Sequence, residues 1–140
     1  MLLVVDANKI FSSLLTGGKT FEIFLGNKLL NKFQFSAPEF LFFEIGKHFD
    51  EIVDRSKLER SELSTVFKFL REEIEFVPLS EFDNFAKEAL KLAPHPKDVQ
   101  YFALALYLNC PIWSNEKSFI KQSLVRICAN PELLKELGIK

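Results

Sequence analysis

The sequence lacks the features that mark several protein classes. Its 18 basic and 19 acidic residues give a net charge of −1, which excludes the global positive charge of a strongly basic nucleic-acid-binding protein but leaves a local basic surface open. No apolar run approaches the roughly 18 residues that a membrane span requires, so we expect no membrane insertion. No basic segment precedes the short apolar run at the start of the chain, so we expect no secretory signal and a cytoplasmic location.

Cysteine and linker sequences are also scarce. Cys110 and Cys128 have no metal-ligand spacing and lie beside apolar segments. We expect reduced core residues, although the sequence leaves a disulfide between them open. Because no repeat, low-complexity tract or Pro/Gly-rich linker interrupts the chain, we expect a single domain over residues 1–140.

Apolar residues are abundant, at 48% of the chain, and 16 of them are Phe. Burying one such side chain stabilises a fold by about 1.5–3 kcal/mol, so the core should be thick and aromatic. The Phe-rich helices have more apolar surface than one small core requires, which predicts a homodimer.

Short apolar segments alternate with amphipathic ones along the chain. Strands are expected at "LLVV", "QFSAP", "EFVPL", "CPIW" and "LVRICA". Helices are expected at residues 9–15, 21–33, 38–55, 62–73, 80–92 and 99–108, at a segment that begins with "SNEKSF", and at 130–137. Ser80 should cap one helix, with Asp83 three residues later, and Asn130 should cap the last, with Pro131 in its first position. This alternation predicts an α/β fold with a mainly parallel sheet.

Four acidic residues lie where such a fold places its functional sites. Ligands of open parallel sheets bind at the carboxyl ends of the strands. Asp6 follows the first strand, and Glu116 comes two residues after Ser114, which ends "PIWS". Asp98 begins an apolar helix, and Glu44 interrupts a Phe-rich helix after the second strand.

Each acid also has a purely structural interpretation. Asp6 is a good helix N-cap residue. First-turn acids such as Asp98 and Glu116 interact with a helix dipole, which contributes about 0.3–1 kcal/mol. Glu44 lies either on a narrow exposed stripe or in the core with a partner. If all four converge, however, their repulsion requires a cation, and oxygen ligands without His or Cys select Mg²⁺ or Mn²⁺ over zinc.

Three sequence blocks carry these residues in a specific order. "VVDANKIFSSLL" runs from a strand into Asp-x-Asn and then a helix with a small hydroxyl residue, and "FLFFEIGKH" carries a second acid. "HPKDVQYFALALYLNCPIWSNEKSF" has an Asp before an Ala/Leu-rich helix, a short Cys/Pro strand, a hydroxyl residue, an acid and a Phe. The residues concerned are Asp6, Asn8, Ser12, Glu44, Asp98, Ser114, Glu116 and Phe119. As a set, they resemble the PIN domain family, and within it the small toxin ribonucleases of the VapC type.

The resemblance implies a three-layer α/β/α sandwich and metal-dependent hydrolysis of RNA phosphodiester bonds, leaving a 5′-phosphate and a 3′-hydroxyl. Asp6, Glu44, Asp98 and Glu116 would then be catalytic and would hold one or two Mg²⁺ or Mn²⁺ ions directly or through water. Asn8 and Ser12 would orient a carboxylate or a metal-bound water, and Ser114 and Ser118 would support the site. A separately encoded antitoxin would cover the acids with a basic residue.

The resemblance has two departures. The fourth acid is commonly Asp, and here it is Glu116; a further Asp is common just before the Phe, where this chain has Ser118. An alternative is therefore a weak or inactive PIN-fold module that binds RNA or a protein. Lysines close to the acids in sequence could contact an RNA backbone; they are Lys9, Lys47, Lys97, Lys117 and Lys121. The alternative for each of them, and the expected one, is a position on the solvated surface without such a role.

Three other functions fit the sequence less well. A phosphotransfer receiver would carry an Asp after its central strand, where "EFVPLS" ends in Leu and Ser. A haloacid-dehalogenase-like phosphatase would need Asp in the position of Asn8. A metal-free ribonuclease would need an oriented histidine pair, and nothing in the sequence orients His48 toward His95.

Overall fold

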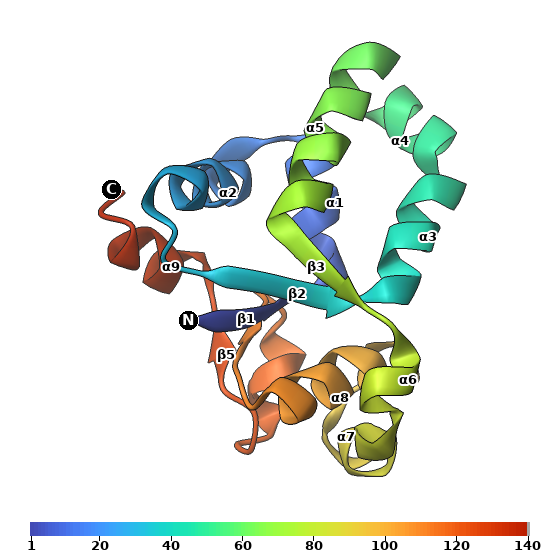
Figure 1. The fold of residues 1–140 in the computed structure, drawn as a ribbon, viewed down its shortest axis with the longest axis vertical. Helices are drawn as coiled ribbons and strands as arrows, with labels where there is room; N and C mark the ends of the chain where they lie inside the picture. The colour runs from blue at the N-terminus through green and yellow to red at the C-terminus, as the bar shows by residue number, and fades with distance from the viewer. Residues whose placement is uncertain (140) are drawn as a thin grey trace.

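A five-stranded parallel sheet forms the centre of the computed structural model, which describes residues 1–139 (Figure 1). The strand order is β3-β2-β1-β4-β5, and every neighbouring pair is parallel. The strands are β1 (Leu2–Val5), β2 (Gln34–Pro38), β3 (Ile74–Val77), β4 (Ile112–Trp113) and β5 (Ile127–Cys128). Figure 1 shows α1, α2 and α5 on one side of the sheet and α6, α7 and α8 on the other. The predicted α/β sandwich with a parallel sheet is confirmed.

The connecting helices are α1 (Ala7–Leu15), α2 (Gly18–Leu30), α3 (Glu39–Lys47), α4 (Phe49–Arg55), α5 (Arg60–Glu73), α6 (Leu79–Phe82), α7 (Ala86–Leu92), α8 (Val99–Leu108) and α9 (Asn130–Glu136). Three short 3₁₀ segments are η1 (Asp83–Phe85), η2 (Pro96–Asp98) and η3 (Lys117–Lys121). Within the described residues, no helix is long and apolar enough to cross a membrane.

Aromatic packing fills the core on both sides of the sheet. Trp113 on β4 contacts Phe24 and Phe35, with ring centroids 5.1 and 5.4 Å away. On the opposite side, Phe102 of α8 contacts Phe119 at 5.0 Å. Since η3 contains Phe119, this contact fixes the segment after β4 against the core.

Two of the expected long helices are divided. The helix expected at residues 38–55 breaks at His48, where α3 ends and α4 begins. The break lets Phe49 pack against Phe67 of α5, with ring centroids 6.2 Å apart. The helix expected at residues 80–92 is also divided, into α6, η1 and α7. The cap prediction for Ser80 is wrong because the N-cap of α6 is Pro78, two residues earlier, and Ser80 lies inside the helix.

The segments near the C-terminal end are shorter than expected. The helix expected from "SNEKSF" is the 3₁₀ segment η3, and β4 and β5 have two residues each. The side chain of Gln122 holds the connection to β5: it donates to the carbonyl oxygens of Phe119 and Val125 and accepts from the Val125 N–H.

Both cysteines are free thiols, as expected. Cys128 is buried, and burial raises the pKa of the half-buried Cys110 thiol to about 11. Neither thiol is therefore a thiolate at neutral pH.

Candidate functional site

Asp6 lies at the carboxyl end of β1, and its backbone N–H donates to the carbonyl of Trp113 on β4. Its side chain is only 4% exposed. The Ser114 hydroxyl donates to Asp6 Oδ2 at 2.8 Å and accepts from the Glu116 N–H at 3.0 Å. Two adjacent strand ends thus join these residues, although 108 positions separate Asp6 from Ser114.

Glu116 has an exposed side chain that a second long-range contact orients. The amide nitrogen of Asn8 donates to Glu116 Oε1 at 3.2 Å. Asn8 is in the first turn of α1, and Glu116 is the residue before η3. The hydrogen bonds of Ser114 and Asn8 therefore hold Asp6 and Glu116 at the junction of β1 and β4.

Asp98 is a half-buried residue at the start of α8 that interacts electrostatically with the other acids. Burial raises the pKa of Asp6, and the negative charges of Asp98 and Glu116 raise it further, while the Ser114 hydrogen bond lowers it. Burial also raises the pKa of Asp98; the nearby Lys97 and His95 lower it and Glu116 raises it. Asp6, Asp98 and Glu116 are named the acid edge below.

The acid edge does not cap its helices. Asp6, Asp98 and Glu116 occupy the N-cap positions of α1, α8 and η3, yet none of their side chains makes a capping hydrogen bond. Asp6 thus occupies the N-cap position that its structural interpretation predicts, and the Asn8 backbone N–H lowers its pKa, but its side chain makes no regular capping hydrogen bond. Favourable charge–dipole interactions at these helix starts remain. An oxygen of Asp6 accepts from Ser114 instead, and an oxygen of Glu116 accepts from Asn8.

Glu44 differs from the other three acids. Its side chain is 45% exposed and lies 3.4 Å from His48 Nε2, so of the two alternatives the exposed stripe is correct. Glu44 and two acids of the acid edge all act electrostatically on Tyr101, a buried phenol on α8. Burial raises the pKa of Tyr101, and the charges of Asp6, Asp98 and Glu44 raise it further. No hydrogen bond or ion pair within residues 1–139 joins the Glu44 side chain to the acid edge.

Ser12 and Ser118 make no side-chain hydrogen bond within the described part of the chain. Ser12 uses its backbone carbonyl to accept from Thr16 at the end of α1. Ser118 is half-buried in η3. Their supporting roles remain predictions.

The two histidines have separate partners. His48 lies between Glu44 and Glu51 on α3 and α4. His95 accepts from the Lys97 N–H through Nδ1 at the start of η2. This arrangement is not that of a histidine pair acting on one bond.

Lys9 is buried, so the expectation that it lies on the solvated surface is wrong. It is 5% exposed, its ammonium lies 3.0 Å from Asn130 Oδ1, and it lies 5.8 Å from the Trp113 ring centroid. Burial lowers the pKa of Lys9, and the charge of Asp6 raises it. The other four lysines named with it are exposed.

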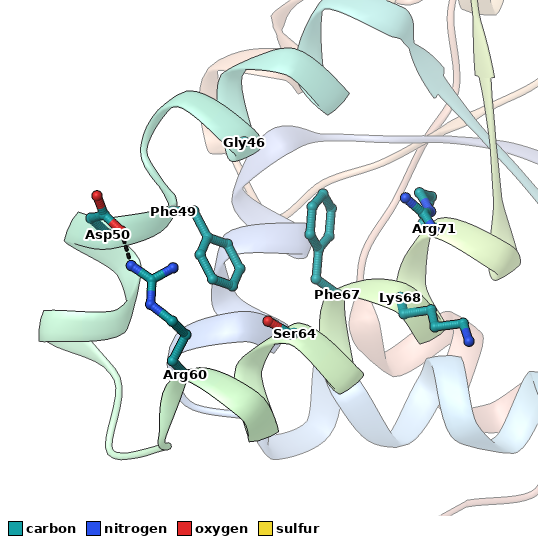
Figure 2. A pocket seen from close by; sticks show the side chains of 8 residues that line it. All are labelled: Gly46, Phe49, Asp50, Arg60, Ser64, Phe67, Lys68 and Arg71. Carbon is teal, nitrogen blue, oxygen red and sulfur yellow. Dashed lines mark hydrogen bonds and ion pairs between the residues drawn. The ribbon is translucent and has the colours of Figure 1, made fainter.

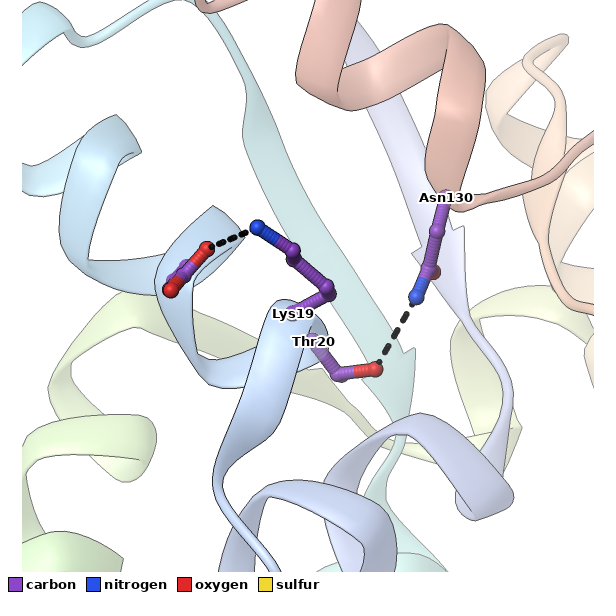
Figure 3. A network of polar contacts seen from close by, with 4 residues as sticks. Lys19, Thr20 and Asn130 are labelled. Carbon is purple, nitrogen blue, oxygen red and sulfur yellow. Dashed lines mark hydrogen bonds and ion pairs between the residues drawn. The ribbon is translucent and has the colours of Figure 1, made fainter. Parts of the chain in front are cut away.

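Asn130 has a role that the sequence did not predict. Ala129, not Asn130, is the N-cap of α9. Asn130 Oδ1 accepts from both Lys9 and the Trp113 indole at 2.8 Å, while its amide nitrogen donates to Thr20 at 3.2 Å. Figure 3 shows Asn130 of α9 facing Thr20 on α2, beside the ion pair of Lys19. An Asn at a helix start matches a cap in sequence, so only the contacts distinguish the two roles.

The donor chemistry of the acid edge fits a hard divalent cation. The charges of Asp98 and Glu116 raise the pKa of Asp6, the charge of Glu116 raises that of Asp98, and a cation would remove this repulsion. As placed, however, no group of three or more His, Cys, Asp or Glu side chains within residues 1–139 forms a ready-made metal site. The acid edge itself consists of carboxylates alone, although His95 lies near Asp98, and oxygen ligands of this kind favour Mg²⁺ or Mn²⁺ over zinc.

Comparison with known proteins supports the fold and identifies the family. A chain of the crystal structure of VapBC2 from Rickettsia felis, bound to a DNA fragment from their promoter, is similar with a TM-score of 0.65 and 12% identity; the match covers 92% of this chain and 98% of that one. No curated protein sequence gives a significant match. The family model described as PIN domain matches residues 4–130, nearly the whole chain. The chain therefore belongs to the PIN domain family.

Proposed function

We propose that this protein is a metal-dependent ribonuclease that hydrolyses RNA phosphodiester bonds. One observation carries the proposal: a buried Asp6 is held by Ser114 while two further carboxylates raise its pKa. Such an arrangement destabilises the metal-free protein and is typical of a site built for a charged ligand rather than for stability.

Asp6, Asp98 and Glu116 would hold Mg²⁺ or Mn²⁺, with Glu44 as a fourth ligand by family resemblance. When bound, such an ion polarises a phosphate oxygen and lowers the pKa of a coordinated water. The hydroxyl of Ser114 holds Asp6 Oδ2, and the amide of Asn8 holds Glu116 Oε1. These two contacts position the carboxylates before any ligand binds.

We further propose that the protein is the toxin of a toxin–antitoxin pair. The similarity to a VapBC2 chain supports this assignment. An antitoxin would place a basic residue at the acid edge. Self-association as a homodimer is supported by exposed apolar side chains on α2, namely Leu25, Leu29 and Leu30. Sedimentation velocity tests it, and a monomer at high micromolar concentration would refute it.

A second candidate is a weak or inactive PIN-fold module. Two observations favour it: the acids do not form a ready-made metal site, and Glu44 is paired with His48. Such a module would bind RNA or a protein partner without cutting.

Paired measurements on carboxylate variants separate these candidates. Asp6→Asn and Asp98→Asn should each abolish Mn²⁺-dependent cleavage of a mixed RNA pool. In the absence of metal, their melting temperatures should equal or exceed that of the wild type, because a repelling charge is removed. Glu116→Asp, which restores the residue common in the family, should retain or improve activity.

The same variants define failure. If Asp6→Asn and Asp98→Asn cleave as well as the wild type, or lose stability with no change in their response to metal, the ribonuclease proposal is wrong. If the wild type cuts nothing in Mn²⁺ while binding RNA, the inactive module is the better description.

A further inference from the structure

A groove lies between α3–α4 and α5, away from the acid edge contacts described above. Its cavity volume is about 470 Å³, within the roughly 300–1,000 Å³ of small-molecule pockets. Figure 2 shows Phe49, Phe67 and Arg60 around it, with Lys68 and Arg71 further along α5. Gly46 of α3 contributes no side chain, and a Cβ added there would meet nothing within 4 Å. This cavity is named the α5 groove.

The charges of α5 are segregated around this groove. The helix carries three basic residues, Arg60, Lys68 and Arg71, and all three line the groove. Its acids, Glu62, Glu72 and Glu73, do not. The spacing of the lining residues of α5 follows the helical repeat, so the three cations share one face. In a chain whose net charge is −1, such a separation is a local basic surface.

Most of this positive charge is not neutralised. Among the described residues, Asp50 is the one acid that lines the groove, and it is paired with Arg60. Neither Lys68 nor Arg71 forms an ion pair within residues 1–139. The groove therefore presents two uncompensated cations to solvent.

A row of three aromatic rings begins in the groove, which Phe49 and Phe67 line, and continues to Phe42, which is not among the lining residues. Phe67 packs against Phe49 on one side and Phe42 on the other, with ring centroids 6.2 and 5.9 Å away. Guanidinium groups cover both ends of this row: Arg60 lies 5.4 Å from the Phe49 ring, and Arg71 lies 6.0 Å from the Phe42 ring. Half-buried rings beside cations form the pattern by which proteins hold single-stranded nucleic acid, stacking bases and neutralising phosphates.

We propose that the α5 groove binds a segment of single-stranded RNA, a substrate contact additional to the acid edge. The proposal rests on the proposed ribonuclease function for its choice of RNA as the nucleic acid. A second copy of the chain is a poorer occupant, because docking through the same face would bring the basic faces of two α5 helices together. An acidic peptide matches the cations but leaves the aromatic row without a stacking partner.

Binding is measured on the full chain, in a chelator that prevents cleavage, with a fluorescently labelled RNA oligonucleotide of mixed sequence. The test variant is Lys68→Glu combined with Arg71→Glu. The matched control is Lys87→Glu combined with Lys91→Glu, which changes the net charge equally at exposed positions on α7. Circular dichroism melts verify folding, and Lys68→Glu alone serves as a milder variant that keeps the Arg71–Phe42 contact.

The groove variant should weaken RNA binding by about tenfold or more at moderate salt, and each lost phosphate contact should lower the slope of log affinity against log salt by about 0.7. The control should stay within about twofold of the wild type, as expected for distant exposed charges. Poly-glutamate should compete weakly, because it offers charge without bases to stack.

Three results would overturn the proposal. The first is an equal loss of RNA affinity in the groove and control variants. The second is competition by poly-glutamate that is as strong as competition by unlabelled RNA. The third is a groove variant that changes the oligomeric state but not the RNA affinity. Cleavage in Mn²⁺ is a separate readout. A protein that binds RNA through the groove but cuts nothing refutes only the ribonuclease proposal. If the protein cuts RNA but the groove variant binds RNA as tightly as the wild type, only the groove proposal is refuted.

Discussion

The acid edge and the α5 groove both concentrate charge of one sign, but they do so by different means. In the acid edge, tertiary contacts such as Ser114 to Asp6 join segments 108 residues apart. In the groove, one helix supplies the three cations through its own periodicity. Burial also differs, since Asp6 is 4% exposed while Lys68 and Arg71 are on the surface.

This difference separates the physical behaviour of the two regions. Charges at a buried site interact strongly and are weakly screened by salt, so single changes there should act on chemistry and on stability. Exposed cations contribute little to stability and act through salt-sensitive association. The predictions below test this contrast, starting with the largest expected effect.

The acid edge should dominate cleavage. Asp6→Asn should lower the rate at saturating RNA by at least about 100-fold, because loss of even an indirect metal partner costs about 10–100-fold. The Lys87→Glu and Lys91→Glu control should cleave like the wild type. Single-turnover cleavage in Mn²⁺ measures both. If Asp6→Asn lowered the cleavage rate less than the groove variant does, the acid edge would not be the main determinant of cleavage.

Removing the side chain of Asn130 should lower the stability of the protein substantially. Asn130→Ala leaves the Lys9 ammonium and the Trp113 indole without their acceptor. We expect a decrease of about 2–4 kcal/mol in the free energy of unfolding, since each unpaired buried group costs about 1–3 kcal/mol. Urea denaturation measures this loss. Asn84→Ala, at an exposed position in η1, is the control and should change stability by less than about 0.5 kcal/mol.

The raised pKa of Asp6 should make stability depend on pH. The pKa of Asp6 in the folded state lies above the ordinary value of 3.8, which applies to the unfolded state. At a pH between the unfolded and folded pKa values, the folded state therefore binds more protons than the unfolded state. The free energy of unfolding of the metal-free protein should therefore fall as pH rises through this window and then level off.

Asp6→Asn should abolish this decrease in the free energy of unfolding with rising pH, because Asn does not titrate. Relative to the wild type it should gain about 1.4 kcal/mol for each unit by which folding raises the pKa. Denaturation of both proteins from acidic to neutral pH measures the difference. A wild type that gains stability relative to the variant as pH rises would contradict the direction.

A substitution at Gly46, which lines the α5 groove, should stabilise the protein slightly. Gly46 lies inside α3, and an added Cβ meets nothing within 4 Å. Gly46→Ala should raise the free energy of unfolding by about 0.5–1 kcal/mol, because Ala loses less backbone entropy in a helix. Gly138→Ala is the contrasting control: its φ of +72° strains an L residue, so it should destabilise. Thermal melts compare the two.

Local patterns predicted most of the fold. The residues of β2 and α8 coincide with the segments expected from "QFSAP" and from residues 99–108. Errors arose where helices break or change type, as at His48 and in the segment around η1. There the decisive interaction is tertiary: Phe49 turns toward Phe67, a partner that the local period does not reveal.

The candidate site divides in the same way. Asp6, Asp98 and Glu116 were selected from sequence because strand ends and helix starts are recognisable locally, and the structure couples their charges. Glu44 could not be ranked among them from sequence, because its distance from the acid edge depends on the direction of α3. The burial of Lys9 could not be foreseen either, because its partner is 121 residues away.

The sequence by itself determined the alternation of strands and helices, the membership of the PIN domain family and the identity of the acids. These properties follow from hydrophobic periodicity and from motifs within short segments. Only the tertiary structure decided that Asp6 is buried against Ser114, that Asn130 holds Lys9 and Trp113, and that the cations of α5 meet an aromatic row. Such pairings depend on how whole elements pack, because burial and long-range hydrogen bonding are properties of the assembled fold and not of any local segment.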